Sequence, residues 1–163
     1  FAAGRKGLYQ IEFMVSDEFD TITRSDKYLL FLENKVSQIN ELTVPERMQR
    51  PTEPQTIVRE LITADVADDQ GLSDIDSVYF YLKRPDGVLV NSGNPFNMVD
   101  NGKPFILSTW YENAGDVTAN DGVYSLSIFF YNDAVRGDYE LKFYVRDKAG
   151  NLSTVLIDSL EVY

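Results

Sequence analysis

The 163-residue sequence contains no cysteine and no histidine, and it has a single tryptophan. Without cysteine there is neither a disulfide framework nor a thiolate metal site. Without histidine the chain lacks the usual general base, the base of most hydrolytic triads and the commonest zinc ligand. Paired carboxylates are the remaining route to catalysis, but the acidic residues cluster in turns, where capping is their usual role. We therefore expect a protein that is not an enzyme.

Basic residues are scarce, with 15 Lys and Arg against 26 Asp and Glu, for a formal net charge of −11. A surface of this sign repels nucleic acid phosphates and anionic membranes, so neither is an expected partner. No apolar run approaches the roughly 18 residues of a spanning helix, which excludes direct membrane insertion by a helix. The first residues do not resemble a signal peptide. We expect any export signal or anchor to lie outside this chain.

Apolar alternation predicts an all-β fold. Ten Phe and ten Tyr supply most of the aromatic residues, and both types favour strands. Strict alternation marks three clear strands at 78–83, 124–128 and 139–145. Five weaker candidates lie at 39–44, 57–66, 96–99, 105–110 and 155–162, which brings the total to about eight strands. Turn sequences rich in Asp, Asn and Gly lie between them, which is typical of an antiparallel β-sandwich of about seven to nine strands.

An internal repeat sets the expected domain boundaries. The segment GLYQIEFMVSD (7–17) matches GDYELKFYVRD (137–147) when the two are aligned without a gap. Each copy continues through a polar turn (18–21 in the first) into another apolar strand. Five positions of the match are identical: Gly7 with Gly137, Tyr9 with Tyr139, Phe13 with Phe143, Val15 with Val145, and Asp17 with Asp147. Tyr139 at the start of a late strand is typical of a tyrosine corner, and Tyr9 repeats it.

Two domains follow from this match. Residues 34–163 are expected to form one complete sandwich, and residues 1–33 are expected to be a β-hairpin equivalent to the last two strands of another copy. The hairpin is then the end of a preceding repeat. The alternative is an assembly arm, because a lone hairpin is marginal in water and has to find a sheet edge in its own domain or in a neighbouring chain.

Three segments resemble a known family: DVADDQGLSDI (65–75), GDVTANDGVYS (115–125) and YELKFYVRDKAGNLS (139–153). Their pattern resembles bacterial immunoglobulin-like (fibronectin-III-like) repeats. The resemblance implies an immunoglobulin-like β-sandwich repeated in tandem within a large secreted, cell-surface or periplasmic protein. It implies a stalk, spacer or adhesive module whose partners are neighbouring repeats or a cell-surface protein. One sandwich fold hosts many roles, so the resemblance is specific for fold and loose for function.

The segment 115–122 is the best candidate for chemistry. Asp116, Asn120 and Asp121, together with Asp100 one turn away, offer the hard oxygen ligands that Ca²⁺ prefers, and neighbouring glycines let the backbone curl around an ion. The spacing is not that of an EF-hand. The competing interpretation is that Asp, Asn and Gly are the residues of sharp β-turns, with side chains bonded to their own backbone.

A second acidic cluster contains Asp65, Asp68, Asp69, Asp74 and Asp76. If it lies at the end of the sandwich that adjoins the preceding module, a cation there would stiffen the array. The competing interpretation is a solvated loop in which these Asp residues cap turns.

The main functional prediction is a non-catalytic spacer or adhesive module. Its first alternative is a self-assembling filament or surface-layer subunit that uses residues 7–33 for strand addition to an identical subunit. The second alternative is a carbohydrate-binding module that stacks a glycan on aromatic residues: Tyr79, Tyr81, Trp110, Tyr111 and Tyr144. For these aromatics, the competing interpretation is a core Trp110 and tyrosines that coat a wet sheet face.

Overall fold

The computed structural model describes residues 7–16, 18, 22–24 and 28–163. Within 34–163, all of it described, eight strands form a three-stranded sheet and a five-stranded sheet, which agrees with the predicted seven to nine strands. The three-stranded sheet has the order β10-β7-β5, with bounds Val123–Tyr131, Ile57–Ala67 and Gln38–Thr43. The five-stranded sheet has the order β6-β12-β11-β8-β9, with bounds Arg47–Met48, Leu156–Val162, Gly137–Asp147, Ile75–Lys83 and Phe96–Met98.

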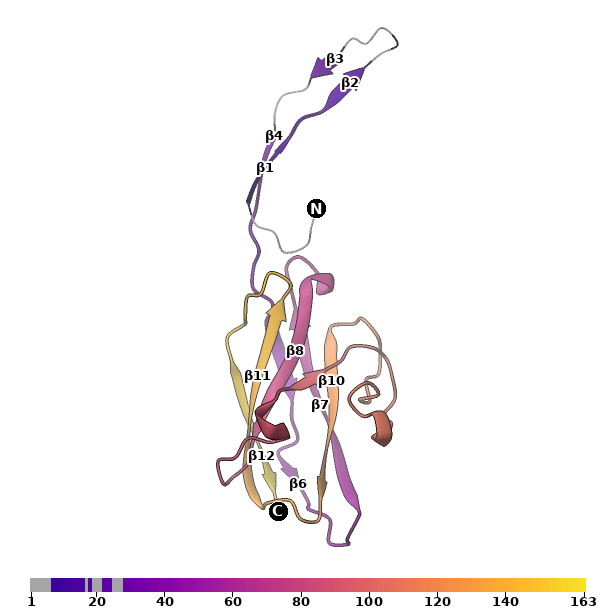
Figure 1. Ribbon diagram of the computed structural model, residues 1–163, viewed down its shortest axis with the longest axis vertical. Helices are drawn as coiled ribbons and strands as arrows, with labels where there is room; N and C mark the ends of the chain where they lie inside the picture. Colours follow the sequence, from indigo (N-terminus) through magenta and orange to yellow (C-terminus); the bar gives the residue numbers. More distant parts are fainter. Residues whose placement is uncertain (1–6, 17, 19–21, 25–27) are drawn as a thin grey trace.

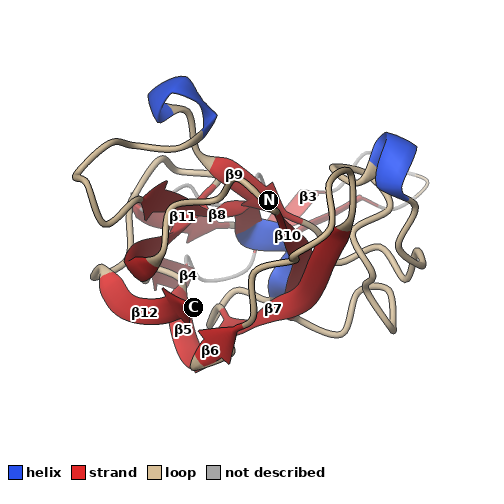
Figure 2. Ribbon diagram, turned by 90° about the horizontal axis from the view of Figure 1, so that it is seen from below, coloured by secondary structure: helices blue, strands red, loops and turns tan. Residues whose placement is uncertain are grey.

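The two sheets pack face to face around one apolar core (Figure 2). Alternation along each strand places one face inside, as β8 shows with Val78, Phe80 and Leu82 buried and the residues between them more exposed. Phe143 of β11 lies against Phe80, with ring centroids 5.1 Å apart. Each such side chain contributes about 1.5 to 3 kcal/mol through burial. The core therefore follows the period-two pattern that the sequence predicts.

The expected tyrosine corner is present. Tyr139 is buried near the start of β11, and its hydroxyl donates to the carbonyl oxygen of Val135 at 2.9 Å. This hydrogen bond joins the loop after β10 to the strand that follows and thereby closes the connection between the two sheets. The side chain of Tyr9, the corresponding residue in the hairpin, is not among those that the structure describes.

One predicted strand is wrong. Residues 105–110 do not pair with a sheet, and Leu107–Thr109 form a single 3-10 turn, η3. The backbone N–H groups of Glu112 and Asn113 both donate to the Thr109 carbonyl, and the Asn113 amide donates to Thr109 Oγ1 at 2.7 Å. These local bonds satisfy the backbone without a strand partner. Two further 3-10 turns, η1 (Leu72–Asp74) and η2 (Asn91–Gly93), connect strands of the sandwich.

The N-terminal part of the chain forms a long hairpin that projects from one end of the sandwich (Figure 1). Strand β1 (Gly7–Ile11) pairs with β4 (Tyr28–Leu32), and β2 (Met14–Ser16) pairs with β3 (Ile22–Arg24), all antiparallel. The predicted matching position Asp17 and most of the turn 18–21 lie outside the described residues. The projecting end is also the end where β11 finishes and β8 begins (Figure 1).

The hairpin has the same strand register as the last two strands of the sandwich. Gly7 of β1 faces Leu32 of β4, and their equivalents in the sequence match, Gly137 of β11 and Val162 of β12, face each other as well. Further along, Ser16 faces Ile22, and the equivalent pair, Arg146 and Leu152, forms a bridge. Both hairpins also shift register by one position between these two points. The backbone pairing therefore repeats together with the sequence.

Candidate functional site

The junction between the hairpin and the sandwich gathers buried polar groups from distant parts of the sequence. Asn34, in the linker, donates through Nδ2 to Asp147 Oδ2 at 2.7 Å, although 113 residues separate them. Ser37 donates to Asp68 Oδ2 at 2.7 Å, and the Gln70 amide donates to the Glu33 carbonyl at 3.3 Å. These bonds tie the linker to the loop after β7 and to the end of β11.

Asp147 is a fully satisfied buried carboxylate. It is 1% exposed, and the backbone N–H of Asn151 donates to Oδ1 at 2.8 Å while the Asn151 side chain donates to Oδ2 at 2.8 Å. Burial raises the pKa of Asp147, but hydrogen bonds from Asn151, Asn34 and the backbone N–H of Ala149 outweigh burial and leave the pKa below its usual value. This carboxylate is therefore charged at neutral pH.

Asp74 has the opposite environment. Its side chain is 0% exposed, and neither carboxylate oxygen has a hydrogen-bond partner among the described residues. Burial raises its pKa, and the charges of Asp68 and Asp147 raise it further, against the opposing charge of Lys148. The Lys148 ammonium group itself donates to the Ser73 carbonyl. The Oδ1 atom of Asn34 is also buried and unpartnered among the described residues.

The predicted second acidic cluster thus divides into separate environments. Asp68, Asp69 and Asp74 come to the junction, where Asp69 forms an exposed ion pair with Lys35 of the linker. Asp76 forms an exposed ion pair with Arg146 instead. Asp65 is exposed on β7. Sequence reasoning did not include Asn34 in this cluster. The signal available for it was only its position at the predicted domain boundary.

The predicted Ca²⁺ ligands lie together in the loop between β9 and β10, and most of them cap backbone. Asp116 is 5% exposed and accepts from the backbone N–H groups of Asn101 and Gly102 at 2.7 and 2.6 Å. Its other oxygen accepts from the Ser125 hydroxyl at 2.9 Å. Gly102 has φ +64°, and a side chain there would press against the backbone of Ala119 at 3.0 Å, so this close turn requires glycine.

The remaining predicted ligands are more exposed than Asp116. Asp100 accepts from the backbone N–H groups of Asp121 and Gly122 at 3.2 and 2.9 Å, and Asp121 accepts from Val123 N–H at 2.9 Å. Asn120 is exposed with φ 59°, as expected in a tight turn. Among the described residues no group of three or more His, Cys, Asp or Glu side chains converges as a preformed metal cluster. Calcium binding by Asp100, Asp116, Asn120 and Asp121 stays a prediction.

Three tyrosines form a cluster on the outer face of the five-stranded sheet. Tyr79 stacks on Tyr144 with ring centroids 5.5 Å apart and an interplanar angle of 19°, and Tyr81 meets both rings edge-on. All three side chains are partly buried, because they cover one another. A sugar would have to separate or displace stacked rings before it could use them as a platform.

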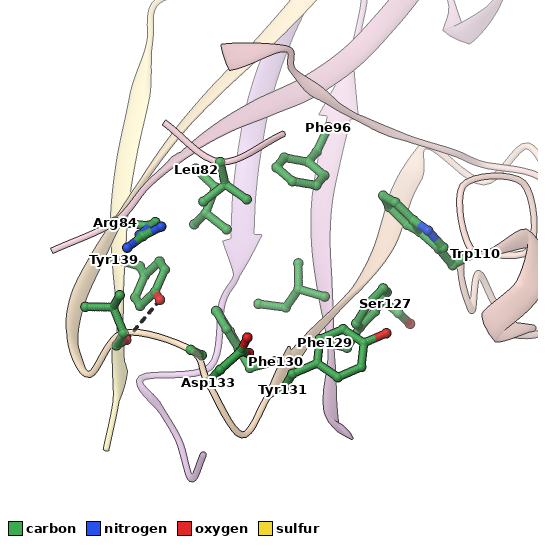
Figure 3. Close-up of a pocket in the computed structure, with 14 residues that line it drawn as sticks. Leu82, Arg84, Phe96, Trp110, Ser127, Phe129, Phe130, Tyr131, Asp133 and Tyr139 are labelled. Carbon is green, nitrogen blue, oxygen red and sulfur yellow. Dashed lines mark hydrogen bonds between the residues drawn. The ribbon is translucent and has the colours of Figure 1, made fainter. Parts of the chain in front are cut away.

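A groove of about 340 Å³ opens at the edge of the sandwich between β8 and β10 (Figure 3). Its apolar lining includes Leu82, Phe96, Phe130, Trp110 and Phe129, and the rings of Phe96 and Trp110 are in contact with centroids 6.1 Å apart. Trp110 packs edge-on against Phe129 with centroids 5.7 Å apart and also against the core, which agrees with the structural interpretation of this residue.

The groove follows an incompletely paired strand edge. On that edge the N–H groups of Ser125 and Ser127 donate to the carbonyls of Val99 and Ala114 at 2.8 and 3.0 Å. Beyond Ser127, β10 is the edge strand of its sheet, and no neighbouring strand pairs with it in the described part of the chain. An extended peptide could add at this edge and direct alternate side chains into the groove.

No protein-family model and no curated protein matches the sequence. Among solved structures, the chain is similar to fibronectin(III)-like modules of Clostridium thermocellum CbhA, with 15% identity, a TM-score of 0.39, and coverage of 97% of this chain and 62% of that one. It is also similar to AggA, the major subunit of aggregative adherence fimbriae type I from Escherichia coli, with 13% identity, a TM-score of 0.40, and coverage of 80% and 98%.

The arrangement of the strands makes the fold an immunoglobulin-like β-sandwich. Two facing sheets, a shared apolar core and the tyrosine corner are the features that define it. All strand pairs of the sandwich are antiparallel except the short pair of β6 with β12, which is parallel. The described part of the chain holds no helix with the length and hydropathy needed to span a bilayer. The immunoglobulin-like sandwich itself specifies no activity, so function has to be argued from the junction, the loops and the edge.

Proposed function

We propose that this chain is a non-catalytic spacer module of an extracellular or cell-surface bacterial protein in which immunoglobulin-like sandwiches repeat in tandem. One observation carries the proposal: residues 7–17 match the sequence pattern of 137–147, and the described strand pairs of the hairpin have the register of the equivalent pairs in 137–162, including the shift by one position. A hairpin that evolved only as an arm has no reason to share this register. Residues 1–33 are then the end of a preceding copy, and 34–163 are one full copy.

The chemistry of the described carboxylates supports a structural role. Asp116, Asp100 and Asp147 each accept hydrogen bonds from backbone N–H groups, so they stabilise turns and loops. In a spacer module, function resides in the distance that the sandwich spans and in its contacts with neighbouring modules or with proteins of the cell surface.

The test compares residues 1–163 with residues 34–163 by size-exclusion chromatography with light scattering and by calorimetry. The spacer proposal expects two monomers and one cooperative unfolding transition in 34–163, at nearly the same temperature as in 1–163. The sandwich has its own core and tyrosine corner, and both lie within 34–163. Loss of cooperative unfolding in 34–163 would contradict the domain boundary at residue 33.

A second function is favoured by the open edge of β10 and its groove. In this alternative, the hairpin of a second copy adds to β10 and makes the chain a self-assembling subunit. The hairpin displays apolar side chains, with Phe13 60% and Val15 68% exposed. This function expects oligomers of 1–163 that disappear in 34–163 and in Val15→Lys. Val117→Lys is the matched control, because Val117 is 84% exposed and lies outside the hairpin, on the loop between β9 and β10. Oligomers that persist in Val15→Lys would refute assembly through the hairpin.

A further inference from the structure

The strongest unexplained feature of the molecule is the buried carboxylate of Asp74. Both its oxygens are unpartnered among the described residues, and the side chain is 0% exposed. A buried carboxylate without hydrogen bonds is unfavourable in either protonation state, because the charged form has no donor to offset its loss of water and the neutral form has an O–H group without an acceptor. Hydrogen bonds within the sandwich therefore do not account for this residue.

Another unpartnered oxygen belongs to the same junction. Asn34 is 8% exposed, and the donation from Nδ2 to Asp147 assigns its amide so that Oδ1 is the free acceptor, which has no partner among the described residues. The negative charges of Asp68 and Asp147 act on Asp74, and among the groups that the structure describes the charge of Lys148 opposes them. A buried location with unpartnered oxygens and an excess of negative charge lacks one component, a positive ion.

We propose that Asp74 and Asn34 bind a divalent cation of the Ca²⁺ class at the junction between the hairpin and the sandwich. All the available ligands are hard oxygens, which suit Ca²⁺ rather than zinc or another soft metal. The described residues present no group of three or more His, Cys, Asp or Glu side chains that could hold a metal ion. The proposed site therefore requires backbone carbonyls and water as its further ligands. Affinity is then expected in the range of extracellular modules, with a Kd on the order of 10⁻⁴ to 10⁻³ M.

The location gives the ion a mechanical consequence. Asn34 belongs to the linker, whereas Asp74 ends η1 directly before β8. An ion shared by the two residues joins the linker to the body of the sandwich and restricts the direction of the hairpin. Cation binding does not depend on the spacer function, but the conclusion that it stiffens an array of modules does rest on that function.

The experiment uses residues 1–163 and measures Ca²⁺ binding by isothermal titration calorimetry and thermal unfolding in EDTA and in about 10 mM CaCl₂. With a Kd on the order of 1 mM, mass action raises Tm by about 3 to 6 °C. Asp74→Asn and Asn34→Ala are expected to remove binding and most of the Tm increase, while circular dichroism confirms that each variant is folded. MgCl₂ and NaCl at equal ionic strength measure how much simple screening of the net charge of −11 contributes.

The controls separate this site from the other candidates. Asp121→Asn alters the loop after β9 and is expected to leave the Ca²⁺ response unchanged; loss of the response in that variant would assign the ion to the loop instead. A Ca²⁺ response that survives in Asp74→Asn, or no response beyond that of MgCl₂ and NaCl in the wild type, would overturn the proposal. Light scattering on the same samples measures the oligomeric state and so tests the spacer function separately. A monomer that binds no cation would contradict only the cation site, and an oligomer that binds the cation would contradict only the spacer function.

Discussion

The same substitution, Asp to Asn, is expected to have opposite effects at the two buried carboxylates of the junction. Asp147 is held by four hydrogen-bond donors, and three of these bonds are 2.7 to 2.8 Å long. An asparagine offers one acceptor oxygen, so its NH₂ group either faces a donor or forces the side-chain amides of Asn34 and Asn151 to turn over and accept. Asp74, in contrast, has no donor to lose among the described residues.

The magnitude follows from these contacts. Loss of a hydrogen bond to a charged group costs about 1.5 to 3 kcal/mol, and the remaining bonds weaken when the charge is removed. We expect Asp147→Asn to lower the free energy of unfolding by about 2 to 4 kcal/mol, and to lower Tm by about 5 to 12 °C. Asp74→Asn in EDTA removes a buried carboxylate that has no hydrogen-bond donor among the described residues, so the stability of the variant is expected to equal or exceed that of the wild type.

Urea denaturation of residues 1–163 in EDTA measures both free energies of unfolding. Asp138→Asn is the matched control, because Asp138 is exposed on the same strand as Asp147 and a surface change of this kind shifts stability by at most about 0.5 kcal/mol. A cost below about 1 kcal/mol for Asp147→Asn, or a cost above about 1 kcal/mol for Asp74→Asn, would refute the reasoning that hydrogen-bond satisfaction distinguishes the two residues.

Two further predictions concern tyrosines. Tyr139→Phe removes the hydroxyl that donates to Val135 and is expected to cost about 1 kcal/mol in chemical denaturation; an unchanged free energy of unfolding would show that the tyrosine corner contributes only packing. Burial, aided by the charge of Asp100, raises the pKa of Tyr124 to about 12. A tyrosine in the unfolded chain ionises at about pH 10. The contribution of Tyr124 to the free energy of unfolding is therefore complete below that pH and is lost as the pH rises toward the pKa of the folded state. Tyr124→Phe is expected to reduce the decline in stability above about pH 10, and an equally steep decline in that variant would contradict this assignment.

Local patterns made much of the fold predictable. Alternating apolar residues placed β8, β10 and β11 correctly, because one face of each strand packs on the core. Local patterns also led to the wrong assignment of 105–110 as a strand. A short apolar run does not reveal whether a strand partner exists. In the folded chain Asn113 and Glu112 satisfy that backbone locally, and Trp110 packs onto Phe129 without pairing.

The candidate sites were predictable only in part. Clusters of Asp, Asn and Gly mark turns and cation ligands equally well in a sequence, because both uses require short oxygen-bearing side chains. The fold distinguishes them by where each oxygen finds a donor. Asp116 finds backbone N–H groups, and Asp74 finds no donor among the described residues.

By itself, the sequence determined the all-β class, the internal repeat and the tyrosine corner, because each depends on residue types at short or fixed spacing. Only the tertiary structure brought Asn34 beside Asp147 across 113 residues and enclosed Asp74 among other charges. Contacts of that range depend on how two sheets pack and on which turn closes each end. The burial that makes an oxygen costly to leave without a partner exists only after that packing is complete.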